Sequence, residues 1–145
     1  MKSVIALIFA VALVEFAAGS YLAKVGDAKD KCKGLHNVDD ETIRQYINQK
    51  KLPESQNGKC FVACIMKEVK ALENGKANVA VMKEANRERN TDEAIIAKAD
   101  QVIDICAQEV SAGGDECETA IQLVKCAITK GREMGIPSPV AHRRR

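Results

Sequence analysis

The stretch Lys59-Cys60-Phe61-Val62-Ala63-Cys64-Ile65-Met66 places two cysteines four residues apart in an apolar setting. On an α-helix this spacing puts both sulfur atoms on one face, one turn apart. Cys60 and Cys64 are poorly placed to bond to each other without breaking the helix, so each is expected to bond to a different segment. Val62 and Met66 form a second row, roughly 160° around the helix from Cys60. This helix is therefore predicted to be buried on more than one side.

The chain contains six cysteines, at positions 32, 60, 64, 106, 117 and 126. Six cysteines can pair in 15 ways, and excluding a bond between Cys60 and Cys64 leaves twelve. The even number indicates three disulfide bonds and no free thiol. A zinc site is the alternative, but the sequence has no Cys-x-x-Cys motif and only two histidines, His36 and His142. We therefore expect no metal and no other cofactor.

Residues 1–20 have the features of a secretory signal peptide. Lys2 precedes an apolar run from Val4 to Val14, which Glu15 ends, and small residues at 17–20 allow cleavage after position 19 or 20. The run is short for a membrane span, which needs about 20 residues. We therefore expect a secreted, extracellular protein, and the oxidising environment outside the cell favours disulfide bonds between its cysteines. The expected organisation is a signal peptide (1–20), a helical domain (21–135) and a C-terminal tail (136–145).

The composition favours one all-α domain with an aliphatic core. Of 145 residues 46% are hydrophobic, yet there are only three Phe, two Tyr and no Trp. The formal net charge is +2, and three positive charges belong to the terminal triplet Arg143-Arg144-Arg145. The body of the protein is therefore not basic, and we expect no nucleic-acid partner.

Apolar residues recurring at the helical period predict six helices. The expected ranges are 21–35, from Asp39 or Asp40 to residue 52, 59–72, 78–88, 90–110 and 115–131. Residues 55–58 are expected to form a loop and residues 73–76 a turn. No sustained alternation of apolar and polar residues predicts a strand. Cys117 and Cys126 lie on opposite sides of the last helix, which is therefore expected to be bonded to two neighbours.

The cysteine spacing Cys-x27-Cys-x3-Cys-x41-Cys-x10-Cys-x8-Cys resembles the pattern of insect odorant-binding and pheromone-binding proteins. The resemblance covers the whole mature chain, and the x3 and x8 gaps are its most characteristic part. It implies a fold of about six α-helices around an internal apolar cavity. It also implies that the first cysteine bonds to the third, the second to the fifth and the fourth to the sixth. In this chain those bonds are Cys32–Cys64, Cys60–Cys117 and Cys106–Cys126.

The resemblance further implies a carrier that reversibly binds small hydrophobic molecules, volatile or fatty-chain, of the odorant or pheromone type. Matching family positions place pocket contacts at Val62, Met66, Ile103, Leu123 and Ala127. The apolar faces of the predicted helices, without the resemblance, suggest Val79, Met82 and Ile96 as further pocket residues. Every one of these eight pocket candidates could instead belong to an ordinary core. With so few aromatic residues, the pocket is expected to be aliphatic and to suit flexible hydrocarbon chains.

The tail carries two apolar residues, Ile136 and Val140, before the charged end His142-Arg143-Arg144-Arg145. In several family members this segment lies over or inside the cavity, so we hypothesise a lid of residues 136–140 with the charges outside. A disordered end is the alternative. His142 alone is weak support for a pH switch.

Two other functions remain open from the sequence. One is a carrier of the same fold outside olfaction, and the other is a disulfide-rich secreted interaction protein with a filled core. An enzyme is not expected, because no Ser/His/Asp arrangement or calcium loop is readable. A membrane receptor is a further candidate partner, and the protein is expected to be a monomer or a weak homodimer.

Overall fold

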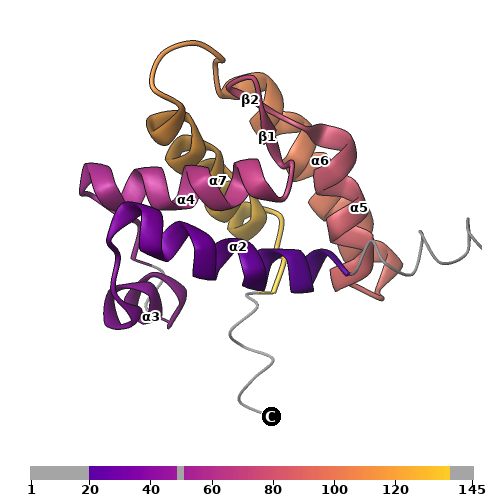
Figure 1. The fold of residues 1–145 in the computed structure, drawn as a ribbon. Coiled ribbons are helices and arrows are strands. Elements are labelled where there is room, and N and C mark those ends of the chain that lie inside the picture. The colour runs from indigo at the N-terminus through magenta and orange to yellow at the C-terminus, as the bar shows by residue number, and fades with distance from the viewer. Residues whose placement is uncertain (1–19, 49–50, 138–145) are drawn as a thin grey trace, which may run out of the picture.

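The computed structural model describes residues 20–48 and 51–137, and in this part of the chain the fold is helical apart from one short hairpin (Figure 1). The elements are α2 (Tyr21–His36), α3 (Asp40–Asn48), α4 (Gln56–Glu68), β1 (Leu72–Glu73), β2 (Lys76–Ala77), α5 (Val79–Arg89), α6 (Glu93–Glu109) and α7 (Glu116–Glu133). The predicted all-α class with six helices is confirmed. The predicted signal peptide lies outside the described residues except for Ser20. No described helix is long and apolar enough to cross a membrane.

Helices α5 and α7 begin within one residue of their predicted starts, and each has a side-chain cap. The Asn78 side chain accepts a hydrogen bond from the Val81 N–H at 3.3 Å. The Asp115 carboxylate accepts one from the Cys117 N–H at 2.9 Å. Each cap satisfies a backbone donor that the first helical turn leaves without a partner.

Helix α4 begins earlier than the sequence predicts, because residues 55–58 are not a loop. The Ser55 hydroxyl caps the helix by accepting the Gly58 N–H at 3.1 Å. Gly58 is buried, and a Cβ atom at this position would clash with the side chains of Tyr46 and Pro53. The glycine therefore allows α3 and the segment after it to pack closely on α4.

The end of α4 and the start of α6 also differ from the prediction. Helix α4 stops at Glu68 instead of residue 72. After it, Asn74 and Gly75, with φ angles of 53° and 71°, form the two-residue turn of the β1–β2 hairpin. Two-residue strands are too short to show alternation in the sequence. Helix α6 begins at Glu93 instead of residue 90, because Asp92 caps it by accepting the N–H groups of Ala94 at 2.9 Å and Ile95 at 3.3 Å. Helix α3 ends at Asn48, short of the predicted residue 52.

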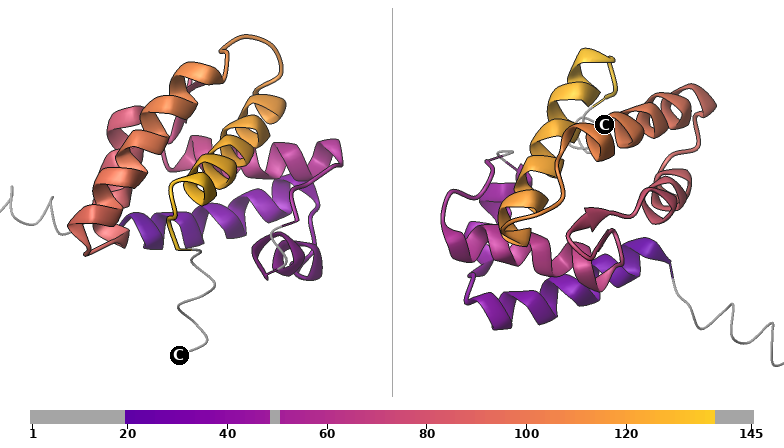
Figure 2. Two further views of the ribbon diagram at one scale, coloured as in Figure 1. Left: turned by 180° about the vertical axis from the view of Figure 1, so that it is seen from behind. Right: turned by 90° about the horizontal axis from the view of Figure 1, so that it is seen from above.

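Five of the helices form a closed ring. Helix α4 packs against α2 and α7, α6 packs against α7 and α5, and α5 returns to contact α2. The view from above in Figure 2 shows this circular order. Helix α3 lies outside the ring, next to the C-terminal end of α2 (Figure 1). The inner faces of the ring helices are therefore turned toward one another, and the region between them is the interior of the ring.

Three of the five ring contacts carry a disulfide bond. Cys32–Cys64 joins α2 to α4, Cys60–Cys117 joins α4 to α7, and Cys106–Cys126 joins α6 to α7. These are the bonds that the family resemblance implies. The two remaining contacts, α5–α6 and α2–α5, are non-covalent.

The buried apolar residues form three clusters instead of one. The first cluster joins α4, β1, α6 and α7 and contains Ala63, Leu72, Val102, Cys106, Ala120 and Leu123. The second joins α2, α3 and α4 and contains Cys32, Val38, Ile43 and Phe61. The third lies between α2 and the end of α4 and contains Ala28, Val69 and Ala71.

The lengths of chain that the disulfide bonds close predict how much each stabilises the fold. Cys60–Cys117 joins residues 57 apart and Cys106–Cys126 joins residues 20 apart. Replacing the first pair by alanine should reduce the free energy of unfolding by about 4 kcal/mol and replacing the second by about 3 kcal/mol, because the longer loop restricts the unfolded chain more. Urea unfolding of the two double variants measures both values. A larger loss from the shorter loop would contradict this account.

Candidate functional site

The inner face of α4 connects the three clusters. Val62 is half-buried and packs against the first and second clusters. Met66 is half-buried and packs against the first and third, and Ile65 packs against the second and third. Val62, Ile65 and Met66 therefore lie on the face of α4 that packs between the three clusters.

Three more predicted residues reach the same interior from other helices. Leu123 of α7 is 4% exposed and belongs to the first cluster. Met82 of α5 packs against the third cluster, and Ile136, after α7, packs against the first. The interior thus receives predicted pocket residues from α4, α5, α7 and the start of the tail.

The other predicted pocket residues are less well supported. Val79, Ile96 and Ile103 are half-buried but belong to none of the three clusters. Ala127 is exposed, so the structure does not place it in the interior. It lies one turn after Leu123 on the same face of α7, but that turn is not covered. Val140 lies outside the described residues.

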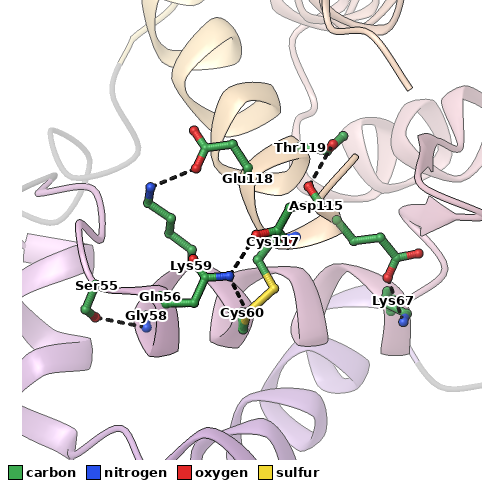
Figure 3. The surroundings of a disulfide bond; sticks show 11 residues. Ser55, Gln56, Gly58, Lys59, Cys60, Lys67, Asp115, Cys117, Glu118 and Thr119 are labelled. Carbon is green, nitrogen blue, oxygen red and sulfur yellow. Dashed lines mark hydrogen bonds and ion pairs between the residues drawn. A yellow bond between two sulfur atoms is a disulfide. The ribbon is translucent and has the colours of Figure 1, made fainter. Parts of the chain in front are cut away.

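Charged and polar side chains fix α7 against α4 on both sides of the Cys60–Cys117 bond (Figure 3). Gln56 donates to Asp115 at 2.8 Å, and the Lys59 ammonium lies 2.7 Å from the Glu118 carboxylate. About two turns further along α4, Lys67 pairs with Glu116 at 2.9 Å. These contacts have no signature in the sequence, because the pairing of charges on two helices distant along the chain depends on how the helices pack.

The α5–α6 contact depends on a buried amide. Asn86 is 8% exposed, and its side-chain nitrogen donates to the Ile96 carbonyl at 3.0 Å and to the Asp100 carboxylate at 2.9 Å. Lys83 pairs with Asp104 at 2.9 Å on the same contact. A buried amide satisfied in this way fixes the relative position of the two helices.

The α2–α5 contact closes the ring through one carboxylate. The two oxygen atoms of Glu88 accept the backbone N–H groups of Tyr21 at 2.9 Å and Leu22 at 3.4 Å. These N–H groups belong to the first turn of α2, where no earlier carbonyl can accept them. A negative charge at this end of a helix is also favoured by the helix dipole.

The chain reverses direction after α7 and returns to the interior. Gly135 has a φ of 70°, and the Ile136 N–H donates to the Gly131 carbonyl at 2.9 Å, as in a Schellman motif. This turn brings Ile136 against the first cluster. His142 and the arginine triplet lie outside the described residues.

A shallow depression at the C-terminal end of α2 is a different feature. It is lined by Asp30, Lys33, Gly34, Asn37, Val38 and Asp39 and is open to solvent. Its lining is mainly polar, and it includes none of the predicted pocket residues. Within residues 20–48 and 51–137, no group of His, Cys, Asp and Glu side chains could hold a metal ion.

The α4–α7 contact should make stability depend on pH in the acidic range. The hydrogen bond from Gln56, followed by that from the Cys117 N–H, lowers the pKa of Asp115 below its ordinary value of 3.8. The stabilisation that these hydrogen bonds give to the ionised Asp115 carboxylate is therefore present above the unfolded-state pKa, and it is lost as the pH falls through the folded-state pKa.

Asp115→Asn should accordingly be more destabilising at about pH 6 than at about pH 3. Urea unfolding midpoints at the two pH values measure this difference. The control is Asp27→Asn, because Asp27 is an exposed carboxylate of α2 with no hydrogen bond or ion pair among the described residues. An equal effect of both substitutions at both pH values would contradict a specific role for Asp115.

Known proteins of similar sequence and structure share this fold. General odorant-binding protein 19d of Drosophila melanogaster is 27% identical over 116 residues, which cover 74% of this chain and 71% of the relative. The solved structure of the odorant-binding protein dmelOBP28a from Drosophila melanogaster gives a TM-score of 0.68 at 26% identity, covering 80% of this chain and 96% of that one.

Two more distant structures agree in fold. Odorant binding protein 5 of Apis mellifera gives a TM-score of 0.62 at 16% identity, covering 75% of this chain and 87% of that chain. The fatty acid binding protein OBP56a from the oral disk of the blowfly Phormia regina gives 0.58 at 23% identity, covering 77% and 91%. The PBP/GOBP family model matches residues 19–130, and the chain therefore belongs to the PBP/GOBP family of odorant-binding proteins.

Proposed function

We propose that this protein is a secreted, extracellular carrier that reversibly binds small hydrophobic molecules in the interior of its helix ring. The observation that carries the proposal is the inner face of α4, where Val62 and Met66 are half-buried, share the first cluster and each contact one further cluster. Membership of the PBP/GOBP family supports the same activity. No catalytic role is part of the proposal.

The division of the core explains why such a carrier needs covalent bonds. A ring whose buried residues form three clusters has less continuous packing than a filled core of the same size, and unfilled volume is destabilising. Three disulfide bonds, each contributing about 2–4 kcal/mol, can offset that loss. The disulfide bonds therefore stabilise the same ring that contains the proposed binding site.

The pocket we propose is lined by Val62, Met66, Met82, Leu123 and Ile136. Val79, Ile96 and Ile103 remain candidates at its margin, since they are half-buried on α5 and α6. All these side chains are aliphatic, and methionine adapts its shape easily. The site should therefore suit flexible hydrocarbon chains of the odorant, pheromone or fatty type. The blowfly protein of similar fold is named as a fatty acid binding protein, which is compatible with such a ligand.

A probe-displacement assay tests the carrier function. The mature, oxidised protein should bind an apolar fluorescent probe saturably, with micromolar affinity, and long-chain alcohols, aldehydes or esters should displace it. Met66→Trp should lower the affinity by about tenfold or more, because the indole occupies space that the ligand needs.

The matched control is Ala127→Trp, which adds the same side chain at an exposed position of α7. It should leave the affinity unchanged, and circular dichroism should confirm that both variants are folded. A folded wild-type protein that binds no probe would instead support an interaction protein with a filled core.

We also propose that the tail covers the pocket. The Schellman turn directs the chain inward, and Ile136 already packs against the first cluster, so the lid would begin at this residue. A chain that ends at Gly135 should release its ligand several-fold faster than the full chain, because an apolar contact over the site is lost. Stopped-flow displacement measures the rate. A chain that ends at Pro137 keeps Ile136 and shows how much the later residues add. Equal release rates for all three chains would contradict the lid.

A further inference from the structure

The side chain of Tyr21 lies where the ring closes and has an apolar environment. Tyr21 is the first residue of α2 and packs against the third cluster, as do Met66 from α4 and Met82 from α5. Two of these three residues belong to the pocket proposed above. Tyr21 therefore brings a hydroxyl group to the margin of an otherwise aliphatic site.

The position of Tyr21 is fixed by its backbone. Its N–H donates to Glu88 of α5 at 2.9 Å, so the residue is held on the contact between α2 and α5. The side chain is half-buried, and burial raises the pKa of the Tyr21 phenol above its ordinary value. A phenol in this setting stays protonated and can donate a hydrogen bond at any physiological pH.

The Tyr21 hydroxyl makes no hydrogen bond with another described residue. Partly buried polar groups in proteins are normally satisfied, and where the protein supplies no partner, water or a ligand does so. The other tyrosine, Tyr46, differs: its hydroxyl lies against Gly58 in the first turn of α4, at the junction with α3 and outside the ring.

The lysine and arginine side chains of the described residues are mostly exposed or lie beside carboxylates. Four of the half-buried lysines are paired with carboxylates: Lys33 with Asp40, Lys59 with Glu118, Lys83 with Asp104 and Lys130 with Glu109 and Glu133. The fifth, Lys29, lies near Asp40, where its charge adds to the hydrogen bond from Lys33 in lowering the pKa of that carboxyl.

An ionised ligand carboxylate inside the ring would therefore lose its hydration without gaining a lysine or arginine partner from the described residues. The mature N-terminus expected at residue 20 or 21 lies beside Glu88, whose carboxylate is already positioned to take its positive charge. An unpaired carboxylate charge is costly to bury, whereas a neutral oxygen needs only one hydrogen-bond partner. The Tyr21 hydroxyl can be that partner for an alcohol, an aldehyde or an ester.

We propose that the Tyr21 hydroxyl is the polar contact of the binding site, and that the site consequently prefers a neutral long-chain alcohol, aldehyde or ester to an ionised fatty acid. The inference rests on the carrier function proposed above and deepens it. The hydrocarbon chain would lie among the aliphatic residues, and its oxygen would bond to Tyr21 near the α2–α5 contact.

Tyr21→Phe tests the proposal, because it removes one oxygen atom and keeps the ring. The affinities of dodecanol, dodecane and dodecanoate are measured for the wild type, Tyr21→Phe and Tyr46→Phe, at mildly alkaline pH where the acid is ionised. Tyr21→Phe should weaken dodecanol binding by about threefold to tenfold, the value of one net hydrogen bond, and leave dodecane binding unchanged. Tyr46→Phe should change neither, and dodecanoate should bind the wild type more weakly than dodecanol.

Each contrary result has a distinct meaning. An unchanged dodecanol affinity, or an equal loss for dodecanol and dodecane, would show that Tyr21 only packs, and would overturn its role as the polar contact. Dodecanoate binding as tight as that of dodecanol would overturn the preference for neutral ligands. If the folded wild type bound none of the three compounds, the carrier function itself would fail.

Discussion

The fold depends on the two disulfide bonds of α4. Cys60 and Cys64 lie one turn apart, and one is bonded to α7 while the other is bonded to α2. Two covalent attachments one turn apart fix not only the position of a helix but also its rotation about its own axis. The row containing Val62 and Met66, on the other side of α4, is consequently held toward the clusters of the interior. The same bonds that hold the ring together therefore orient its most important inner face.

Helix α5 is the exception in this ring, because it contains no cysteine. It is held to α6 by the buried Asn86 amide and to α2 by the Glu88 carboxylate. Separating α5 from its neighbours thus costs only side-chain hydrogen bonds and packing, whereas separating any other neighbouring pair breaks a covalent bond. Regions held in this way open at lower free energy than the rest of a structure. Helix α5 is therefore the part of the ring expected to separate from its neighbours at the lowest free energy.

The disulfide framework could be predicted because the cysteine spacing resembles that of a known family; the spacing by itself left twelve pairings open. The local capping signal was equally readable at Asp115. The failures have a different cause. Gly58 suggests a loop, yet it is helical and buried because Tyr46, from another helix, packs on it. The contact of Glu88 with Tyr21 joins residues 67 apart and has no local signature.

Helical periodicity likewise identifies which face of a helix is apolar, but not how much of that face is buried. Leu123 and Ala127 share one face of α7, but only Leu123 is covered by neighbouring elements. The composition of the interior was easier to predict than its boundaries, since few aromatic residues are available anywhere in the chain. An aliphatic interior with flexible methionines adapts to many hydrocarbon shapes and discriminates poorly among them. Discrimination between ligands must then come from groups that cannot adapt. Charges that are already paired offer no partner to an ionised ligand, whereas a single hydroxyl group held by its backbone offers a hydrogen bond to a neutral one.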